Sequence, residues 1–215
     1  MAYTLTEIRD ELEKALSDTA NDIWSTDLLD RCILQALREV SKASPRLTND
    51  YTTATDDTCE YDLSSETNLL GVAQVWYPWD HTDDDYPAYP VPFFMVDEDT
   101  VRLNLEEGEI SDDYDIRWFF WKEHTINGLD GASASTINDP WLEELVIEGA
   151  AAHALEAITV EYINTLTNTV DTVDQFRKEA ERRLRLYYAK LATVRREFRG
   201  GHVPGWSLDK WDSAS

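Results

Sequence analysis

The sequence predicts an α+β protein: a four-helix bundle, made of two helical pairs, with an inserted small antiparallel β-sheet or sandwich. In the regions 5–40 and 176–198, apolar residues recur every three or four positions, which is the period of one helix face. Between residues 46 and 126 the pattern changes to short alternating runs that are typical of strands. We therefore expect a helical pair at 1–45, a β-rich insertion at 46–126, a helical hairpin at 127–199 that completes the bundle, and an extended C-terminal tail at 200–215.

The first 45 residues contain start and stop signals for two helices. Thr4 and Glu7 have the spacing of a capping box, so one helix should begin after Thr4 and end near residue 17. Ser25 or Thr26 should cap the second helix. This helix should end before Pro45, because the residue before a proline avoids the helical conformation.

The insertion contains five runs with the composition of strands. They are Thr58–Leu63, Leu69–Tyr77, Phe93–Val96, Val101–Leu105 and Tyr114–Trp121. In the last run Phe119 and Trp121 fall on the outward face, which indicates a second contact surface. We expect a region of four to six strands.

The hairpin combines an alanine-rich helix with a basic one. Asn138 or Asp139 should cap the first helix, with Pro140 in its first turn. Small residues from Gly149 to Ala157 would let another helix approach closely. The second helix should end near Arg199, where two glycines follow.

Charge is distributed very unevenly along the chain. The net charge is −24, yet residues 177–199 hold nine of the 19 basic residues. Most of the surface is therefore unsuited to nonspecific binding of DNA. The basic helix can pair with the protein's own acidic groups, bind phosphate or dock onto an acidic partner protein, and we favour the protein partner because Trp206 and Trp211 follow it. The high Asp and Arg content resembles that of proteins from extreme halophiles.

No motif predicts catalysis, a cofactor or a metal. Phosphate-binding glycine loops and nucleophile elbows are missing from the sequence. The run Asp83-Asp84-Asp85 beside His81 lacks the spacing of a calcium loop and is interpreted as a solvated loop. Cys32 and Cys59 are expected to be two separate small buried residues. We therefore expect a protein that is not an enzyme.

No segment predicts an association with membranes. The longest apolar runs fall well short of the ~20 residues that span a bilayer. The N-terminal residues lack the basic and apolar regions of a signal peptide. Synthesis in the cytoplasm and no membrane partner are expected.

Five segments, in this order, resemble the head-to-tail adaptor (connector) proteins of tailed viruses. They are Leu5–Asp10, Trp24-Ser25, Leu28–Ser41, Asp139–Leu142 and Gly149–Ala152. A β-rich insertion lies between the third and the fourth of these segments, and a basic helix follows the fifth, as in that family. These segments are helix-packing patterns, so the resemblance depends on the order of the parts.

The resemblance implies a virion structural protein at the head–tail junction, the neck. Such proteins form a ring, usually a dodecamer, below the portal protein. The ring extends the channel through which genomic DNA passes without sequence-specific binding, and it joins the capsid vertex to the next neck or tail protein. The acidity of this chain would suit a virus of a halophilic, haloarchaeal host.

Two sets of contact residues follow from this resemblance as hypotheses. The portal-docking set consists of Arg182, Arg185, Arg195, Arg196, Phe198, Arg199, Trp206, Leu208 and Trp211. The ring-packing set, which would contact neighbouring copies, consists of Gly149, Ala150, Ala151, Ala154 and Ala157.

Two alternatives remain at this point. One is a DNA-binding packaging or regulatory protein that uses the first two helices as a helix-turn-helix. Its recognition helix would be a poor one, because Arg31 and Arg38 are accompanied by Asp27, Asp30 and Glu39. The other is a metal-dependent enzyme that uses the loop at Asp83.

Overall fold

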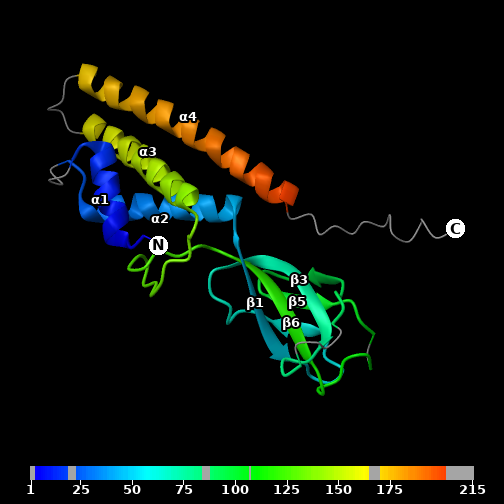
Figure 1. The fold of residues 1–215 in the computed structure, drawn as a ribbon. Coiled ribbons are helices and arrows are strands. Elements are labelled where there is room, and N and C mark those ends of the chain that lie inside the picture. Colours follow the sequence, from blue (N-terminus) through cyan, green and yellow to red (C-terminus); the bar gives the residue numbers. More distant parts are fainter. Residues whose placement is uncertain (1–2, 19–22, 84–87, 107, 165–169, 202–215) are drawn as a thin grey trace. The chain divides into compact units, whose positions relative to one another are not determined.

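The computed structural model describes residues 3–18, 23–83, 88–106, 108–164 and 170–201, and it has a mixed α+β fold (Figure 1). Within these ranges there are four helices and six strands. The chain divides into a helical unit, residues 1–44 and 126–215, and a β unit, residues 45–125. These divisions lie next to the expected boundaries at 45/46 and 126/127.

The two N-terminal helices begin and end where the caps predict. They are α1 (Leu5–Leu16) and α2 (Thr26–Ala43). The amide of Glu7 donates to the Thr4 hydroxyl (3.4 Å), and the amide of Thr4 donates to the Glu7 carboxylate (2.7 Å), which completes the capping box. Ser25 caps α2 by accepting a hydrogen bond from the amide of Leu28.

The two C-terminal helices are α3 (Pro140–Asn164) and α4 (Val170–Gly201). Asp139 caps α3, since its carboxylate accepts a hydrogen bond from the amide of Trp141 (2.9 Å). The helix α4 runs two residues past its predicted end at Arg199. In the helical unit, α3 contacts each of the other three helices and lies beside α4 (Figure 1).

All four helices contribute to one hydrophobic core. Ile8 and Leu12 come from α1, Ile33 from α2, Leu145 from α3 and Tyr187 from α4, and all five are almost fully buried. Burial of each such side chain stabilises the fold by roughly 1.5–3 kcal/mol.

Helices α2 and α4 both come close to α3 at Gly149. A Cβ atom placed there would be 2.7 Å from the ring of Tyr187 and 3.0 Å from the Cβ of Ala36. The Tyr187 hydroxyl in turn donates to the carbonyl of Ala36 (3.4 Å). Gly149 therefore makes room for the ring that joins α4 to α2 and α3.

The β unit consists of two three-stranded antiparallel sheets. The first has the order β1–β6–β3, formed by β1 (Arg46–Thr53), β6 (Asp115–Lys122) and β3 (Leu69–Trp79). The second has the order β2–β5–β4, formed by β2 (Glu60–Asp62), β5 (Thr100–Leu103) and β4 (Phe93–Met95). The expected antiparallel β-region of four to six strands is confirmed.

Both sheets contribute to a second core. Alternate residues of β6, namely Ile116, Trp118 and Phe120, are buried there together with Val101 and Leu103 of β5. The strand β1 was not expected from the sequence, because its side chains are mostly exposed and lack a clear alternation. Its pairing with all eight residues of β6 defines it instead.

We expect that Gly149→Ala lowers the free energy of unfolding, because the new methyl group overlaps the ring of Tyr187. Overpacking of this kind costs ~1–3 kcal/mol, against a gain of ~1 kcal/mol in helix propensity. Gly149→Leu should cost more. Chemical denaturation measures both, with the exposed Ala189→Leu of α4 as a control that should change little. An unchanged stability of Gly149→Leu would contradict the close approach.

Candidate docking surface on the last helix

The basic residues of α4 lie on its outer side because its apolar stripe faces inward. Ala180, Tyr187, Leu191 and Val194 are buried in the core of the helical unit. Of the portal-docking set, Arg182, Arg185, Arg195 and Arg196 are exposed and Phe198 is half-buried. The amphipathic pattern therefore sorts the residues as the sequence predicts.

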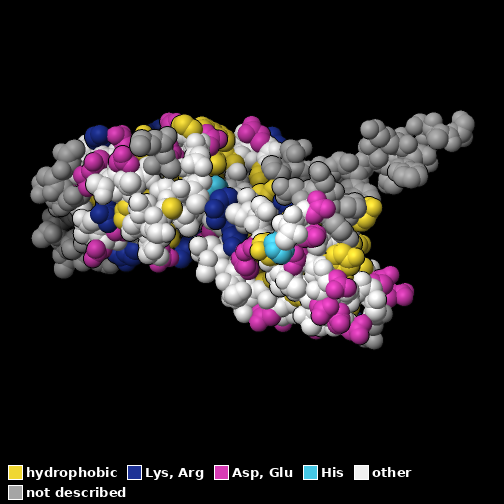
Figure 2. Space-filling model, turned by 60° about the horizontal axis from the view of Figure 1, so that its bottom comes forward, with side chains coloured by type: hydrophobic (Ala, Val, Ile, Leu, Met, Phe, Trp, Pro, Cys, Tyr) yellow, Lys and Arg dark blue, Asp and Glu magenta, His cyan; other side chains and the backbone are white. Residues whose placement is uncertain are grey.

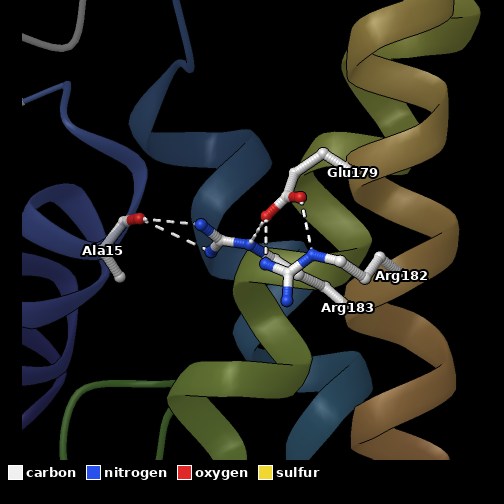
Figure 3. A network of polar contacts seen from close by, with 4 residues as sticks. All are labelled: Ala15, Glu179, Arg182 and Arg183. Carbon is white, nitrogen blue, oxygen red and sulfur yellow. Dashed lines mark hydrogen bonds and ion pairs between the residues drawn. The ribbon is translucent and has the colours of Figure 1, made fainter.

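Part of this basic side is neutralised by the helix itself. Glu179 lies between Arg182 and Arg183 and accepts hydrogen bonds from both guanidinium groups at 2.6–2.8 Å (Figure 3). These hydrogen bonds, first from Arg182 and then from Arg183, lower the pKa of Glu179 to about 2. Arg183 also points toward the carbonyl oxygen of Ala15 in α1, at 3.4 Å (Figure 3).

Two further cations of α4 have acidic partners. Lys190 binds Glu148 of α3, with Nζ 2.5 Å from the nearer carboxylate oxygen. Arg177 pairs with Glu181 one turn along the same helix, at 3.3 Å. The interpretation that the basic face pairs with the protein's own acidic groups therefore holds for Arg177, Arg182, Arg183 and Lys190.

The C-terminal half of α4 has unpaired arginines. In the described ranges, no ion pair involves Arg185, Arg195 or Arg196. Large apolar side chains are also exposed on α4: Tyr188 (46% accessible) lines a groove together with Arg195, and Leu186 (52%) lies on the other flank, near Glu148 and Lys190. We call the three arginines, Leu186 and Tyr188 the α4 docking surface. Arginines next to exposed apolar groups are the composition that anchors protein interfaces.

A shallow groove between α2 and α4 borders the α4 docking surface. It is lined by Glu39, Lys42, Tyr188, Leu191, Ala192 and Arg195. The Tyr188 hydroxyl donates to the Glu39 carboxylate at 3.4 Å. Lys42 and Arg195 are the two cations that line the groove. The docking surface thus extends from α4 toward the C-terminal end of α2.

The remaining predicted docking residues cannot be placed. Trp206, Leu208 and Trp211, and the side chain of Arg199, lie outside the described residues. The portal-docking set is therefore described only along α4.

The ring-packing set lies inside the chain's own core. Gly149, Ala150, Ala151 and Ala154 are buried within the helical unit, and Ala157 is half-buried. Their small side chains accommodate α2 and α4 of the same chain, as Gly149 shows. Any contact with a neighbouring copy has to use other, exposed residues.

The buried polar residues of the helical unit have structural partners. His153 is 4% exposed, with its ring nitrogens 3.2 Å from the Glu39 carboxylate and 3.4 Å from the Gln35 amide. Burial raises the pKa of the Cys32 thiol to about 11, so it remains protonated at neutral pH. Both cysteines are free, and Cys59 lies in the other unit.

The outer face of the β1–β6–β3 sheet contains an aromatic cluster that the sequence only hinted at. Arg117 of β6 lies 5.0–5.9 Å from the ring centres of Trp76, Trp79 and Phe119. Tyr51 is opposite Arg117 in the register of β1. Alternation placed Phe119 outside, but the pairing with β1 and β3 was needed to bring the other rings to it.

Close to this cluster lies a polar group that the sequence did not reveal. His81 Nδ1 is 2.5 Å from Asp115 Oδ2, although 34 positions separate them. Asp83 is exposed, while Asp84 and Asp85 lie outside the described residues. The sequence grouped His81 with the acidic run Asp83-Asp84-Asp85, but in the structure its side chain contacts Asp115.

Negative charge is concentrated in the β unit. Residues 45–125 contain 20 of the 43 acidic residues but only four of the 19 basic ones. On the face shown in Figure 2, acidic side chains gather over the β unit, whereas basic and acidic ones lie side by side over the helices. Among the described residues, no helix is long and apolar enough to cross a membrane.

Comparison with known proteins does not place the chain in a family. No protein-family model matches the sequence, and no curated protein matches it.

We expect that Glu179→Gln destabilises the protein at pH 7, because two adjacent arginines lose their shared carboxylate. The loss should be ~1 kcal/mol or less, since solvent screens these partly exposed groups. The pKa of Glu179 is lowered on folding, so its stabilisation is present above pH ~4.5 and is lost toward pH 2. The difference in the free energy of unfolding between wild type and variant should therefore become smaller as the pH falls from 4.5 to 2.

Chemical denaturation at a series of pH values measures this difference. Glu181→Gln is the matched control, because among the described residues Glu181 forms an ion pair with Arg177 alone and both side chains are more than 60% exposed. A constant difference between pH 7 and pH 2 would show that Glu179 does not act through its charge.

Proposed function

We propose that the protein is a virion structural protein of a tailed virus, a head–tail adaptor below the portal. The observation that carries this proposal is the order of the elements. Two capped helices, an inserted β unit, an alanine-rich helix opened by Asp139-Pro140-Trp141 and a long basic helix follow one another as in the adaptor family. In this proposal the four helices form a four-helix bundle that supports the rest of the adaptor.

The charge distribution is suited to a channel for DNA. The β unit has four basic residues against 20 acidic ones, so it repels phosphate. A ring with such surfaces toward its lumen would let genomic DNA pass without adhering. The same acidity would keep the surface hydrated in the cytoplasm of a halophilic, haloarchaeal host.

The α4 docking surface supplies the contact with the portal protein. Its three arginines have no acidic partner in the described part of the chain, so they are available to carboxylates of another protein. Leu186 and Tyr188 add apolar area that would be removed from water on docking. Phe198 and the segment after α4 would extend this contact.

Ring contacts use outward-facing residues in this proposal. The buried Gly149–Ala154 face is occupied, but Trp141 and Val160 of α3 are 38% and 58% accessible. A ring of such copies, a dodecamer in this proposal, would join them through exposed positions of this kind and present its far side to the next neck or tail protein.

Electron microscopy of the purified protein and of virions tests the proposal directly. We expect a closed ring, located at the neck of the virion. A protein that stays monomeric at high concentration and high salt, and is missing from the neck, would refute it. Tight binding to duplex DNA with a steep dependence on salt would favour the alternative of a DNA-binding packaging or regulatory protein instead.

We further expect that Arg195→Glu combined with Arg196→Glu weakens attachment to the portal without unfolding the protein. Both side chains are exposed and lack ion pairs in the described ranges, so reversing them changes the docking surface rather than the core. Co-purification with the portal protein measures attachment, and circular dichroism checks the fold. Lys178→Glu is the control, as it reverses an exposed charge near the other end of α4. If the double variant attaches to the portal protein as well as Lys178→Glu does, the C-terminal half of α4 is not part of the interface.

A further inference from the structure

Three potential metal ligands meet in the β unit, although they come from two distant segments. Asp80 and His81 follow the end of β3, and Asp115 is the first residue of β6. In the sheet register Trp79 pairs with Asp115, so the two residues after Trp79 are brought beside the Asp115 carboxylate. One ligand atom from each of the three residues lies within 4.8 Å of the other two.

The histidine is held in a fixed orientation. His81 Nδ1 is 2.5 Å from Asp115 Oδ2, and the His81 amide donates to the same oxygen at 3.3 Å. The imidazole stacks on the ring of Tyr51, with centres 4.7 Å apart and planes 8° from parallel. Contacts of this kind reduce the entropy that a ligand side chain loses on binding.

Burial and charge distinguish this group from the exposed acidic loops. The side chain of Asp115 is only 7% exposed, whereas that of His81 is 43% exposed. In the described part of the chain, neither Asp80 nor Asp115 pairs with a lysine or an arginine. The nearly buried Asp115 carboxylate therefore has His81 as its ion-pair partner among the described residues.

We propose that Asp80, His81 and Asp115 bind a divalent transition-metal ion, with Zn²⁺ as the representative case. One imidazole nitrogen and two carboxylate oxygens are ligands that Zn²⁺ accepts, with water at the open position on the exposed side. The imidazole favours such ions over Ca²⁺ and Mg²⁺, which prefer oxygen ligands alone.

The ion takes the place of the proton between His81 and Asp115. In the neutral tautomer with the proton on Nε2, the lone pair of Nδ1 faces the carboxylate, and the ion lies between them. Bond lengths of ~2.0–2.2 Å require the two atoms to separate by less than about 1 Å. The exposed position of His81 allows this shift.

Isothermal titration calorimetry of the full chain with zinc chloride tests the site. We expect one stoichiometric site, and His81→Ala should weaken its binding at least about tenfold. Asp115→Asn and Asp80→Asn should also weaken it. Asp83→Asn is the matched control, because it removes a neighbouring exposed carboxylate that lies outside the three-residue group.

Cobalt substitution gives a readout that does not depend on heat. We expect visible absorption bands of bound Co²⁺ that are lost in His81→Ala, with the fold checked by circular dichroism. Binding of Zn²⁺ that is unchanged in His81→Ala would overturn the proposal. So would several weak sites that take up Ca²⁺ equally well, because they would reflect only the general acidity of the chain.

Discussion

The helical unit depends on how closely α4 approaches α3 at Gly149. The ring of Tyr187 occupies the space that any larger residue would fill, and its hydroxyl reaches the carbonyl of Ala36 in α2. One aromatic side chain thereby joins three helices, and the small residues around Gly149 are used within the chain. Because that face is occupied within the chain, the surface that the helical unit presents to other molecules consists of the outward sides of its helices.

The basic residues of α4 are of two kinds, those with an acidic partner in the chain and those without one among the described residues. Arg182, Arg183 and Lys190 have acidic partners within the helical unit, so part of their charge is already neutralised. Of the arginines that form no ion pair in the described residues, Arg195 lies beside Tyr188 in the groove between α2 and α4. At molar salt the Debye length falls to ~3 Å, so attraction between charges acts only at contact. A docking surface that functions at high salt therefore needs apolar area next to its charges, which is the arrangement at the C-terminal half of α4.

Local signals were enough to predict much of the fold. The capping box at Thr4, the cap at Ser25 and the start of α3 at Pro140 depend on residues a few positions apart, and all three are confirmed. Alternation located β5 and β6, and a longer apolar run with β-branched and aromatic residues located β3. Sequence patterns failed where long-range pairing decides the outcome: β1 is defined by β6, and His81 meets Asp115 only because Trp79 pairs with Asp115. Periodicity also marked the alanine-rich face as a packing surface, but it could not tell packing within the chain from packing between copies.

The charge of the β unit explains why a metal ion at the start of β6, as proposed above, would stabilise the fold. Its acidic residues outnumber its basic ones by five to one, so each carboxylate brought close to another raises the electrostatic cost of folding. Alternation along β6 buries Ile116 and Trp118 on one face and puts Asp115 on the other, where its side chain is still only 7% exposed. Arg117 lies on the same face as Asp115, but its guanidinium group is directed to the aromatic rings, 5.0 Å from the ring centre of Trp79. β3 and β6 already pair at this point, and a cation bound by His81, Asp80 and Asp115, as proposed above, would stabilise the unit by neutralising charge that the strand register brings together.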